Sequence, residues 1–529
     1  MNMALHVLNR KKIPCLRLVL LAIALVVSTG CAVGLDYIRP EAPEMKEWIE
    51  KEDPRIKNES ADLAAWWKRF KDPVLDNLIE RAFQQNLSLR MAGIRILEAR
   101  AQLGIAVGNQ YPQLQQLRGD YAGYGLSENA ANTMAGIDTN FSAANIGFDA
   151  AWELDFWGRF RRAVESGVWS LDATVAGYDD ILVTLVAEVA RTYVVIRTLE
   201  TRIAIAQENV TIQERSLQIA RVRFDAGDVT ELDVAQARTL LGDTQAFIPR
   251  LKAQLRQAKN GLAVLLGLLP GEVNPLLGVP GQIPSVPPDV ETGVPAELLR
   301  RRPDIRLAES QMAAQCALIG VATADLYPKF NLFGSIGLSA SNAAITAAGF
   351  PGGSSLGDIW GSDSLMYYGG IGFAWDIFNY GRIKNRIRVQ DARFQGLIEN
   401  YKSTVLKAAQ EVEDGLCAFL RSQEEVTFLR ESVGGATRSV QLSMTQYREG
   451  LVDYQRVLDT QRSQTQTQDQ LTFTQGSVLL NLVATYKALG GGWEIRRGHD
   501  FLPDEIKNEM RQRTDWGGLL NPVELETAP

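Results

Sequence analysis

One unit occurs twice in this 529-residue chain, and this duplication limits the fold more than any other feature of the sequence. The copies span residues 146–227 and 369–450 and keep a constant offset of 223 residues. Each copy begins with alternating apolar and polar residues, passes an aromatic cluster with a Gly-Arg pair, and continues in a long stretch without proline. The clusters read AWELDFWGR at 151–159 and AWDIFNYGR at 374–382. A register kept without a gap over this distance indicates a duplicated structural element.

The alternating part of each copy has the two-residue period that is typical of a β-strand. One face is apolar, and the other carries small and acidic residues. The apolar positions are Ile146, Phe148, Ala150, Trp152 and Leu154 in the first copy, and Ile371, Phe373, Trp375 and Ile377 in the second. The pattern fits an outer-membrane strand, in which lipid-facing and lumen-facing residues alternate. It fits a half-buried strand of a soluble sandwich equally well.

The stretch after each Gly-Arg pair is predicted to form one helix on the order of 100 Å long, at about 1.5 Å per residue. In the first copy two apolar series repeat every seven residues: Ile203, Val210, Leu217 and Phe224, and Ile205, Ile212 and Ile219. The two series lie about 160° apart around a helix, so they mark nearly opposite flanks. A two-stranded coiled coil would show a single seam instead. The pattern therefore predicts a wall of helices, in which each helix has a neighbour on either side.

Residues 1–30 have the features of a secretory signal peptide, because basic residues precede a short apolar run. The run Leu18–Val27 is too short to span a bilayer as a helix. The segment ends in STGC at 28–31, which resembles a lipobox, so Cys31 is the predicted site of a diacylglycerol and an N-acyl lipid. The alternative is an ordinary signal peptide followed by an incidental cysteine. No later segment is long and apolar enough for a transmembrane helix, so any span of the mature chain is predicted to consist of strands.

The stretch AWWKRFKDPVLDNLIERAFQQNLSLRMAGIRILEARAQ at 65–102 resembles outer-membrane efflux proteins of the TolC/OprM type, in their lipoprotein branch. A related stretch, GVPAELLRRRPDIRLAES, recurs at 293–310, and both copies run on to a Tyr-Pro pair. The resemblance covers about residues 28–493. It implies an α+β membrane protein whose three chains form a 12-stranded β-barrel, which a periplasmic α-helical barrel continues.

The number of strands requires several chains for closure. Each chain offers four predicted strands, whereas closed membrane barrels begin at about eight. An open sheet edge in lipid would leave backbone groups without hydrogen bonds, so the sheet must close with strands of other chains. This reasoning allows two or three copies, and the resemblance selects a homotrimer.

The predicted organisation is an internally duplicated chain between two terminal segments. In order, these parts are a signal peptide (1–30), a lipidated extended arm (31–63), the first repeat (64–269), a proline-rich linker (270–294), the second repeat (295–493) and a C-terminal tail (494–529). The first repeat has strands near 113–125 and 142–155 and long helices near 159–226 and 229–267. The second has strands near 329–340 and 365–378 and long helices near 382–449 and 452–489. Poor order is expected for the tail.

Composition argues against several classes of function. The formal net charge is −7 and residues 1–30 are basic, so the mature chain is more acidic still, which argues against nucleic acid as a partner. The chain has two histidines, no phosphate-binding glycine pattern and no zinc-type spacing, so no catalytic residue and no metal site are predicted. Cys316 and Cys417 are expected to be two buried free thiols. The charge run Arg300–Arg302 is expected on a solvated helix face or cap.

The resemblance also implies a gate at the periplasmic tips, where the long helices turn. Asp459 matches an aspartate of the closing ring in the lipoprotein branch. Gln455 stands where a bulky apolar residue is usual, and Arg456 where TolC-like members have a second aspartate. Asp233 matches a tip carboxylate that ties neighbouring helices in relatives, and we expect it to pair with Arg456 or Tyr447. The alternative for Asp233 is an ordinary surface salt bridge worth about 0–1 kcal/mol.

The polar face near the predicted strands carries four acids, which are Asp149, Glu153, Asp155 and Asp376. Lining the pore of a trimer, these acids should attract cations into it. Aromatic residues near the strand ends would form the inner girdle at the membrane interface, namely Trp152, Phe156, Trp157, Trp375, Phe378 and Tyr380.

These features predict the exit duct of a tripartite efflux system in the outer membrane of a Gram-negative bacterium, for drugs or other small toxic compounds. The implied partners are a periplasmic adaptor and an inner-membrane pump of the proton-driven RND type. Two alternatives stay open: an outer-membrane duct for type I protein secretion, and a poreless periplasmic coiled-coil lipoprotein. The strand alternation argues against the poreless protein.

Overall fold

The structure is a computed structural model that describes residues 32–43, 45–57, 63–129, 138–285, 287, 289–293, 295–343 and 355–521. The predicted signal peptide, the lipidation site Cys31 and the end of the predicted tail lie outside these residues. The chain divides into two compact units. Unit 1 comprises Met1–Arg39, Ala99–Leu171 and Ser310–Ile398, and unit 2 comprises Pro40–Glu98, Asp172–Glu309 and Glu399–Pro529.

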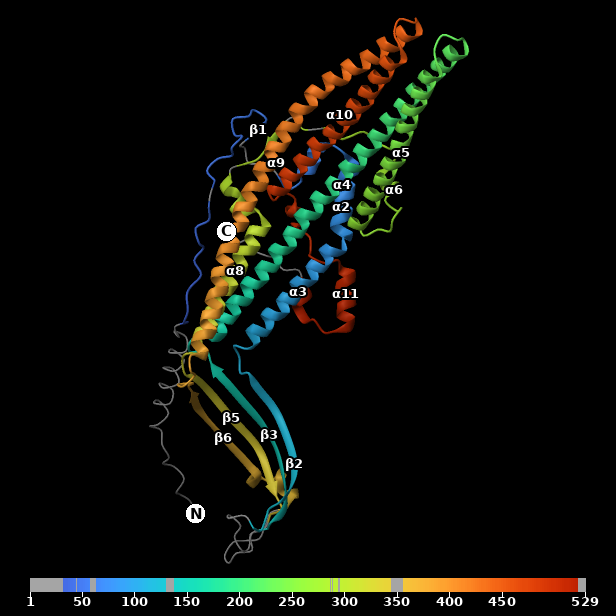
Figure 1. Cartoon of the computed structure of the whole chain (residues 1–529). Helices are drawn as coiled ribbons and strands as arrows, with labels where there is room; N and C mark the ends of the chain where they lie inside the picture. Colours follow the sequence, from blue (N-terminus) through green and yellow to red (C-terminus); the bar gives the residue numbers. More distant parts are fainter. Residues whose placement is uncertain are drawn as a thin grey trace, which may run out of the picture. The chain divides into compact units, whose positions relative to one another are not determined.

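Unit 1 contains a four-stranded antiparallel sheet in the order β2-β3-β5-β6 (Figure 1). The strands are β2 (Leu114–Gly125), β3 (Asn140–Leu154), β5 (Lys329–Ser341) and β6 (Leu365–Ala374). Strands β3 and β5 belong to different repeats and pair from Ala143 with Ser341 to Leu154 with Phe330. Among the described strands, β2 pairs only with β3, and β6 only with β5. Both edges of the described sheet are therefore open.

The strand register brings the predicted apolar residues of both repeats to one face of the sheet. In one row across the strands, Phe148 is the partner of Ile336, which is the partner of Tyr367. These three side chains are 44%, 54% and 78% exposed. A soluble sandwich would bury such a row, whereas a lipid-facing surface leaves it uncovered. The sheet therefore favours the membrane strand over the soluble alternative.

Strand β6 ends at Ala374 rather than near residue 378. The register partner of Ala374 is Lys329, the first residue of β5. Pro328 precedes it, and a proline has no N–H to extend the ladder. The predicted strand was too long because the alternating pattern continues beyond the end of the partner strand.

The aromatic clusters of the two repeats make the same contact in unit 1. Trp152 donates its indole N–H to the carbonyl oxygen of Gln110 at 3.1 Å. Its counterpart Trp375 donates to the carbonyl oxygen of Leu326 at 2.9 Å. Each acceptor lies directly before a Tyr-Pro pair. Both clusters are thus held to the turn that leads into the first strand of their own repeat.

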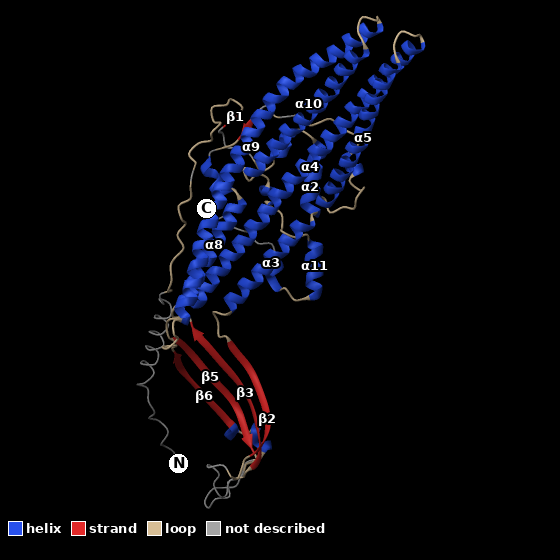
Figure 2. Ribbon diagram, viewed as in Figure 1, coloured by secondary structure: helices blue, strands red, loops and turns tan. Residues whose placement is uncertain are grey.

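Most of the remaining chain is helical (Figure 2). The longer helices are α2 (Pro73–Gln85), α3 (Leu87–Gly108), α4 (Arg159–Asp225), α5 (Glu231–Leu265), α8 (Pro303–Ala324), α9 (Arg382–Arg448), α10 (Tyr454–Ala488) and α11 (Asp504–Arg513). Short elements are β1 (Ile56–Lys57), η1 (Trp66–Phe70), α6 (Asn274–Leu277), β4 (Val290–Glu291), η2 (Pro295–Glu297), α7 (Leu298–Arg301), η3 (Leu356–Trp360), η4 (Ser362–Ser364), η5 (Trp493–Arg496) and η6 (Gly517–Leu520). Over the described residues, no helix combines the length and apolar character needed to cross a membrane.

Within unit 2, helix α4 contacts two helices through different kinds of side chain. Ile203 packs against Leu251 of α5. Arg202 instead donates two hydrogen bonds to the carboxylate of Asp469 on α10, at 2.7 and 2.9 Å. The second apolar series, Ile205, Ile212 and Ile219, is only partly buried. Two neighbours are present, as expected. At the level of Arg202 the contact with α10 is polar, whereas nearer the tip Ile219 packs against an apolar cluster that includes residues of α10.

In unit 2 both repeats close with a contact at the end of their second long helix. The side chain of Asn86 donates to the carbonyl oxygen of Leu265 at 2.9 Å, where α5 ends. Arg302 donates to the carbonyl oxygen of Ala488 at 2.7 Å, where α10 ends. Arg302 is 7% exposed and also binds the Glu411 carboxylate at 2.8 Å. Of the two expectations for the charge run, the solvated face is therefore wrong for Arg302, and the helix cap is confirmed.

The segment after residue 493 is folded up to residue 521, contrary to the expected poorly ordered tail. Arg496 forms an ion pair with Asp179, which is fully buried. Leu502 and Met510 pack against Leu97 in a small apolar cluster. Ion pairs, including those of Glu494 with Arg301 and of Arg496 with Asp179, and a few apolar contacts hold this segment, and such contacts leave no periodic pattern in the sequence.

The two cysteines of the described chain are both free. Cys316 is buried in unit 1, with its Sγ atom 3.7 Å from the carbonyl oxygen of Leu35. Cys417 is exposed. The expected burial therefore holds for Cys316 and is wrong for Cys417 in this chain.

Candidate functional site at the helix tips

Each repeat reverses direction at a short tip between two long helices of unit 2 (Figure 1). Gly227 follows α4 with a φ of 81°, and Gly450 follows α9 with a φ of 76°. In both tips the N–H of the residue after the glycine returns to a carbonyl oxygen of the last helical turn, at 2.9 Å. A left-handed glycine with this hydrogen bond is the Schellman ending of a helix. The two tips are therefore built on the same turn.

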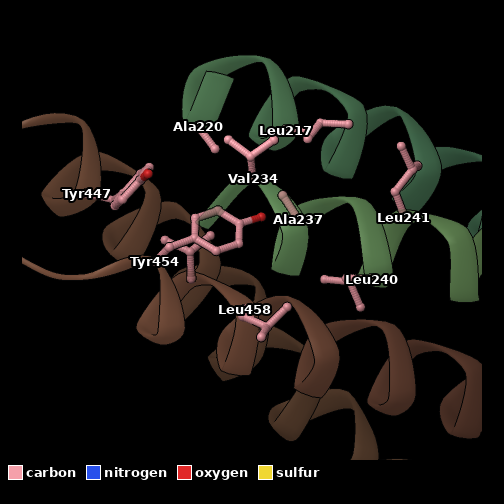
Figure 3. Close-up of a cluster of buried hydrophobic side chains, with 10 residues drawn as sticks. Leu217, Ala220, Val234, Ala237, Leu240, Leu241, Tyr447, Tyr454 and Leu458 are labelled. Atoms are coloured by element: carbon pink, nitrogen blue, oxygen red, sulfur yellow. The ribbon is translucent and has the colours of Figure 1, made fainter. Parts of the chain in front are cut away.

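A cluster of buried side chains packs the two tips together (Figure 3). Its members are Leu217 and Ala220 from α4, Val234, Ala237, Leu240 and Leu241 from α5, Tyr447 from α9, and Tyr454, Val457 and Leu458 from α10. Because all four helices contribute, the tips cannot separate without exposing apolar surface, at about 25 cal/mol per Å². The polar contacts of the site lie next to this tip cluster, and Tyr447 belongs to both.

The central polar contact of the tips joins Tyr447 to Asp233. The phenolic O–H of Tyr447 donates to Asp233 Oδ2 at 3.0 Å, and the tyrosine is 1% exposed. Burial, and then the hydrogen bond to Asp233, raise the pKa of Tyr447 above its usual range. The expected pairing of Asp233 is thus confirmed for Tyr447. Arg456, the other expected partner, is exposed, and its backbone N–H binds the carboxylate of Asp453 at 3.2 Å.

Tyr454 supports Tyr447 from the neighbouring helix. The two rings meet edge to face, with centroids 5.3 Å apart at 69°. The hydroxyl of Tyr454 lies 3.0 Å from the Oγ atom of Ser216 on α4. Burial raises the pKa of Tyr454 as well. Both phenols therefore remain neutral hydrogen-bonding groups at physiological pH.

Arg223 is a further tip residue that the sequence reasoning missed. Its guanidinium lies over the ring of Tyr447, 4.7 Å from the ring centroid, and donates to the carbonyl oxygen of Tyr447. It also lies 3.9 Å from the carboxylate of Asp228 in the first tip. At the repeat offset, Gln446 occupies the place of Arg223, and Phe224 that of Tyr447. A position-by-position comparison of the two tips could have marked both differences.

Gln455 and Asp459 take part in a second polar contact between the tips. The side-chain N–H of Gln236 on α5 donates to Gln455 Oε1 at 3.2 Å. Gln455 in turn donates to Asp459 Oδ1 at 3.0 Å. Gln455, Arg456 and Asp459 are all exposed in this chain. That the Asp459 residues of three chains form a ring around a constriction stays a prediction.

Three of the four acids predicted to line the pore contact arginines of unit 1. Glu153 pairs with Arg159 at 3.2 Å, and its counterpart Asp376 pairs with Arg382 at 3.4 Å. Each repeat thus supplies the arginine of its own Gly-Arg pair as a partner for one acid, and the attraction of cations by these acids stays a prediction.

Asp155 also has a local role. Its carboxylate accepts hydrogen bonds from the backbone N–H groups of Phe160 and Arg161, at 3.0 and 2.9 Å, and pairs with the Arg161 side chain at 3.2 Å. It therefore compensates the positive end of the α4 dipole and a neighbouring cation. Asp149 lies in the sheet between its register partners Gln116 and Ser335, without an arginine in its row.

Known proteins similar to this chain have the same architecture. The family described as outer membrane efflux protein matches residues 78–268 and 294–491, which correspond to the two repeats. The pyoverdine export outer membrane protein OpmQ of Pseudomonas putida is 34% identical over 442 residues, which cover 81% of this chain and 88% of OpmQ. The cation efflux system protein CusC of Escherichia coli is 28% identical over 488 residues, covering 91% and 99%.

The solved structure of the outer-membrane channel OprN superimposes with a TM-score of 0.80 at 31% identity, covering 88% of this chain and 100% of OprN. Sequence and fold thus agree along both repeats, and the resemblance drawn from residues 65–102 and 293–310 is confirmed. The chain therefore belongs to the outer membrane efflux protein family and is the outer-membrane channel component of an efflux system.

Proposed function

We propose that three copies of this chain form a passive exit duct, which works with a periplasmic adaptor and an inner-membrane pump. The observation that carries this proposal is the four-stranded sheet with two open edges and an exposed apolar face. In lipid, an open edge leaves backbone N–H and C=O groups unsatisfied. Strand β6 of one copy must then pair with β2 of the next, and three copies supply twelve strands. The duct performs transport without a chemical step.

The proposed cargo is small molecules rather than protein chains. Similar proteins are named for the export of pyoverdine, toluene and cations. This range supports small-molecule efflux over type I protein secretion. Because these compounds share no chemical group, selection of the cargo falls to the pump and not to the duct.

The proposed gate lies at the tips of the long helices. In each chain the Tyr447–Asp233 hydrogen bond, with Arg223 above it, acts as a latch on the closed state. Asp459 lines the constriction together with Gln455 and Arg456. A cation one turn from each Asp459 reduces repulsion among three carboxylates, so the closed ring needs no apolar residue at position 455.

The proposed anchor is a diacylglycerol and N-acyl lipid on Cys31. The arm that follows this residue is held at the aromatic end of the sheet in unit 1, since the N–H of Val33 donates to the carbonyl oxygen of Trp157 at 3.0 Å. This position supports an acylated residue at the membrane interface. Mass spectrometry of the mature protein tests it, because a Cys31→Ala variant should lose the mass of the lipid.

Conductance of the purified full-length protein in a planar bilayer tests the duct. We expect a trimer with a low open probability, and a protein without any conductance would contradict the proposal. For the gate, Asp233→Ala and Asp459→Ala should each raise the closed-state leak. Asp243→Ala, which removes an exposed acid of α5 away from the tip contacts, is the matched control. An unchanged leak in both tip variants would show that the gate lies elsewhere.

A further inference from the structure

The first turns of helix α9 carry an unusual density of cations. Four of them form what we call the α9 basic cluster: Lys384, Arg386, Arg388 and Arg393. All four side chains are exposed. Within the described residues, none of the four has a carboxylate at salt-bridge distance, and the guanidinium of Arg388 binds only the side-chain oxygen of Asn385, at 3.1 Å. In a chain with a net charge of −7, such a group needs an explanation.

The equivalent turn in the first repeat is neutralised. At the start of α4, Arg161 pairs with Asp155 at 3.2 Å. Arg162 pairs with Glu165 at 2.8 Å and with Asp36 of the N-terminal arm at 2.6 Å. Each of these cations therefore has a partner within unit 1, and the start of α4 presents little net charge.

Two replacements remove this neutralisation in the second repeat. At the constant offset, Phe378 stands in the place of Asp155, so Lys384 lacks the partner that Arg161 has. Arg388 stands in the place of Glu165, which turns an acid into a cation. The second copy of one structural element has thus exchanged two carboxylates for an aromatic ring and a positive charge. The stability of the element does not require these cations, because the first copy folds with Ala163, Glu165 and Ser170 in the places of Arg386, Arg388 and Arg393.

The surroundings of the cluster indicate a membrane interface. In unit 1, α9 begins directly after the aromatic residues that follow strand β6 (Figure 1). Phe378 is 88% exposed and Tyr380 is fully exposed. Aromatic rings concentrate at the boundary between hydrocarbon and water, and long cationic side chains near that boundary extend to the lipid phosphates. The apolar face of the sheet, the aromatic residues and the cations follow one another along the chain in that order.

We propose that the α9 basic cluster binds the phosphate headgroups of anionic phospholipids in the periplasmic leaflet of the outer membrane. This inference rests on the proposed duct, because it requires the sheet to lie in that membrane. Bound headgroups would hold the start of α9 at a fixed depth, at the point where strand becomes helix. The first repeat has no such site, so the contact would recur once per chain around a trimer.

Reconstituted full-length protein provides the test. Brominated phosphatidylglycerol and brominated phosphatidylcholine quench the tryptophan fluorescence, and the ratio of their apparent affinities measures the preference for the anionic headgroup. The test variant is Lys384→Gln/Arg386→Gln/Arg388→Gln. The matched control is Arg250→Gln/Lys252→Gln/Arg256→Gln, which removes the same charge from exposed positions of α5.

We expect the wild type and the control to prefer phosphatidylglycerol and the test variant to lose about tenfold or more of that preference, since each cation near an anionic surface contributes severalfold. The preference should also fall at high salt. Equal preferences in all three proteins would overturn the inference. So would a test variant that keeps its preference while its trimer dissociates at a lower temperature, because its cations would then pair with a neighbouring chain. Conductance of the same samples separates this result from a failure of the duct itself, which would abolish conductance in the wild type.

Discussion

Removing one hydroxyl group should weaken the closed state of the tips. Tyr447→Phe deletes the donor to Asp233 and leaves the ring in the tip cluster, beneath Arg223. A hydrogen bond to a charged group contributes about 1.5–3 kcal/mol. Asp233 is partly exposed and regains water when the phenol is lost, so the lower end, about 1.5 kcal/mol per chain, applies.

This energy corresponds to about a tenfold change in the closed-to-open ratio for one chain. If three tips open together, the effects add to about 4–5 kcal/mol, which is on the order of a thousandfold. The open probability of single channels in a planar bilayer measures either outcome. Tyr486→Phe is the matched control, because this tyrosine is buried in unit 2 and its hydroxyl makes no hydrogen bond within the described residues.

The combined variant decides whether the two residues act as a pair. Tyr447→Phe and Asp233→Asn should each raise the open probability, and the double variant should do so no more than the stronger single one, because contacting residues are not additive. Additive effects would refute a direct latch, as would an open probability in Tyr447→Phe equal to that of the Tyr486→Phe control.

Three further predictions concern stability, pH and ion selectivity. Arg496→Ala should lower the free energy of unfolding by about 3 kcal/mol, measured by thermal denaturation. The buried carboxylate of Asp179 then keeps only the more distant guanidinium of Arg306, at 3.4 Å, as an ion-pair partner within the described residues. The raised pKa of Tyr447 stabilises the closed tip fully below about pH 10, the pKa of a free tyrosine, and this stabilisation declines progressively as the pH rises from there toward the higher pKa of the closed tip. Leak should therefore increase gradually above about pH 10 in the wild type and not in Tyr447→Phe. Asp149→Asn should reduce cation preference, read from reversal potentials, more than Glu153→Gln, whose charge Arg159 already compensates.

The parts of the fold that were predictable from the sequence are those with a period. Alternation over two residues marked strand β3 and its apolar face, and the constant offset carried the assignment to the second repeat. The limits of the four long helices lie close to the predicted ones because glycines and a change of pattern mark both ends. These signals are local, so they need no knowledge of which segments meet.

The parts that were not predictable depend on pairs of distant polar residues. Arg202 of α4 and Asp469 of α10 are 267 residues apart in the sequence, and no spacing links the two residues. The ion pair of Arg496 with Asp179 also joins residues that are far apart in the sequence, with a separation of 317 residues. Because a buried charged pair is selected by its partner and not by its neighbours in the chain, a single sequence gives no sign of it.

Comparison of the two copies distinguishes residues that stabilise the shared fold from residues with a role in only one copy. Where the two copies keep the same chemistry, they make the same contact, as Trp152 and Trp375 do in unit 1 and the glycines of the two tips do in unit 2. Where a pair of equivalent positions differs in charge or polarity, the contacts differ as well. Phe224 is 41% exposed, whereas its counterpart Tyr447 is buried and holds a carboxylate. Both the proposed latch and the proposed lipid contact lie at such positions. Since one element folds with either set of residues, the demands of folding do not explain these differences, and the separate tasks that we propose for the two copies account for them.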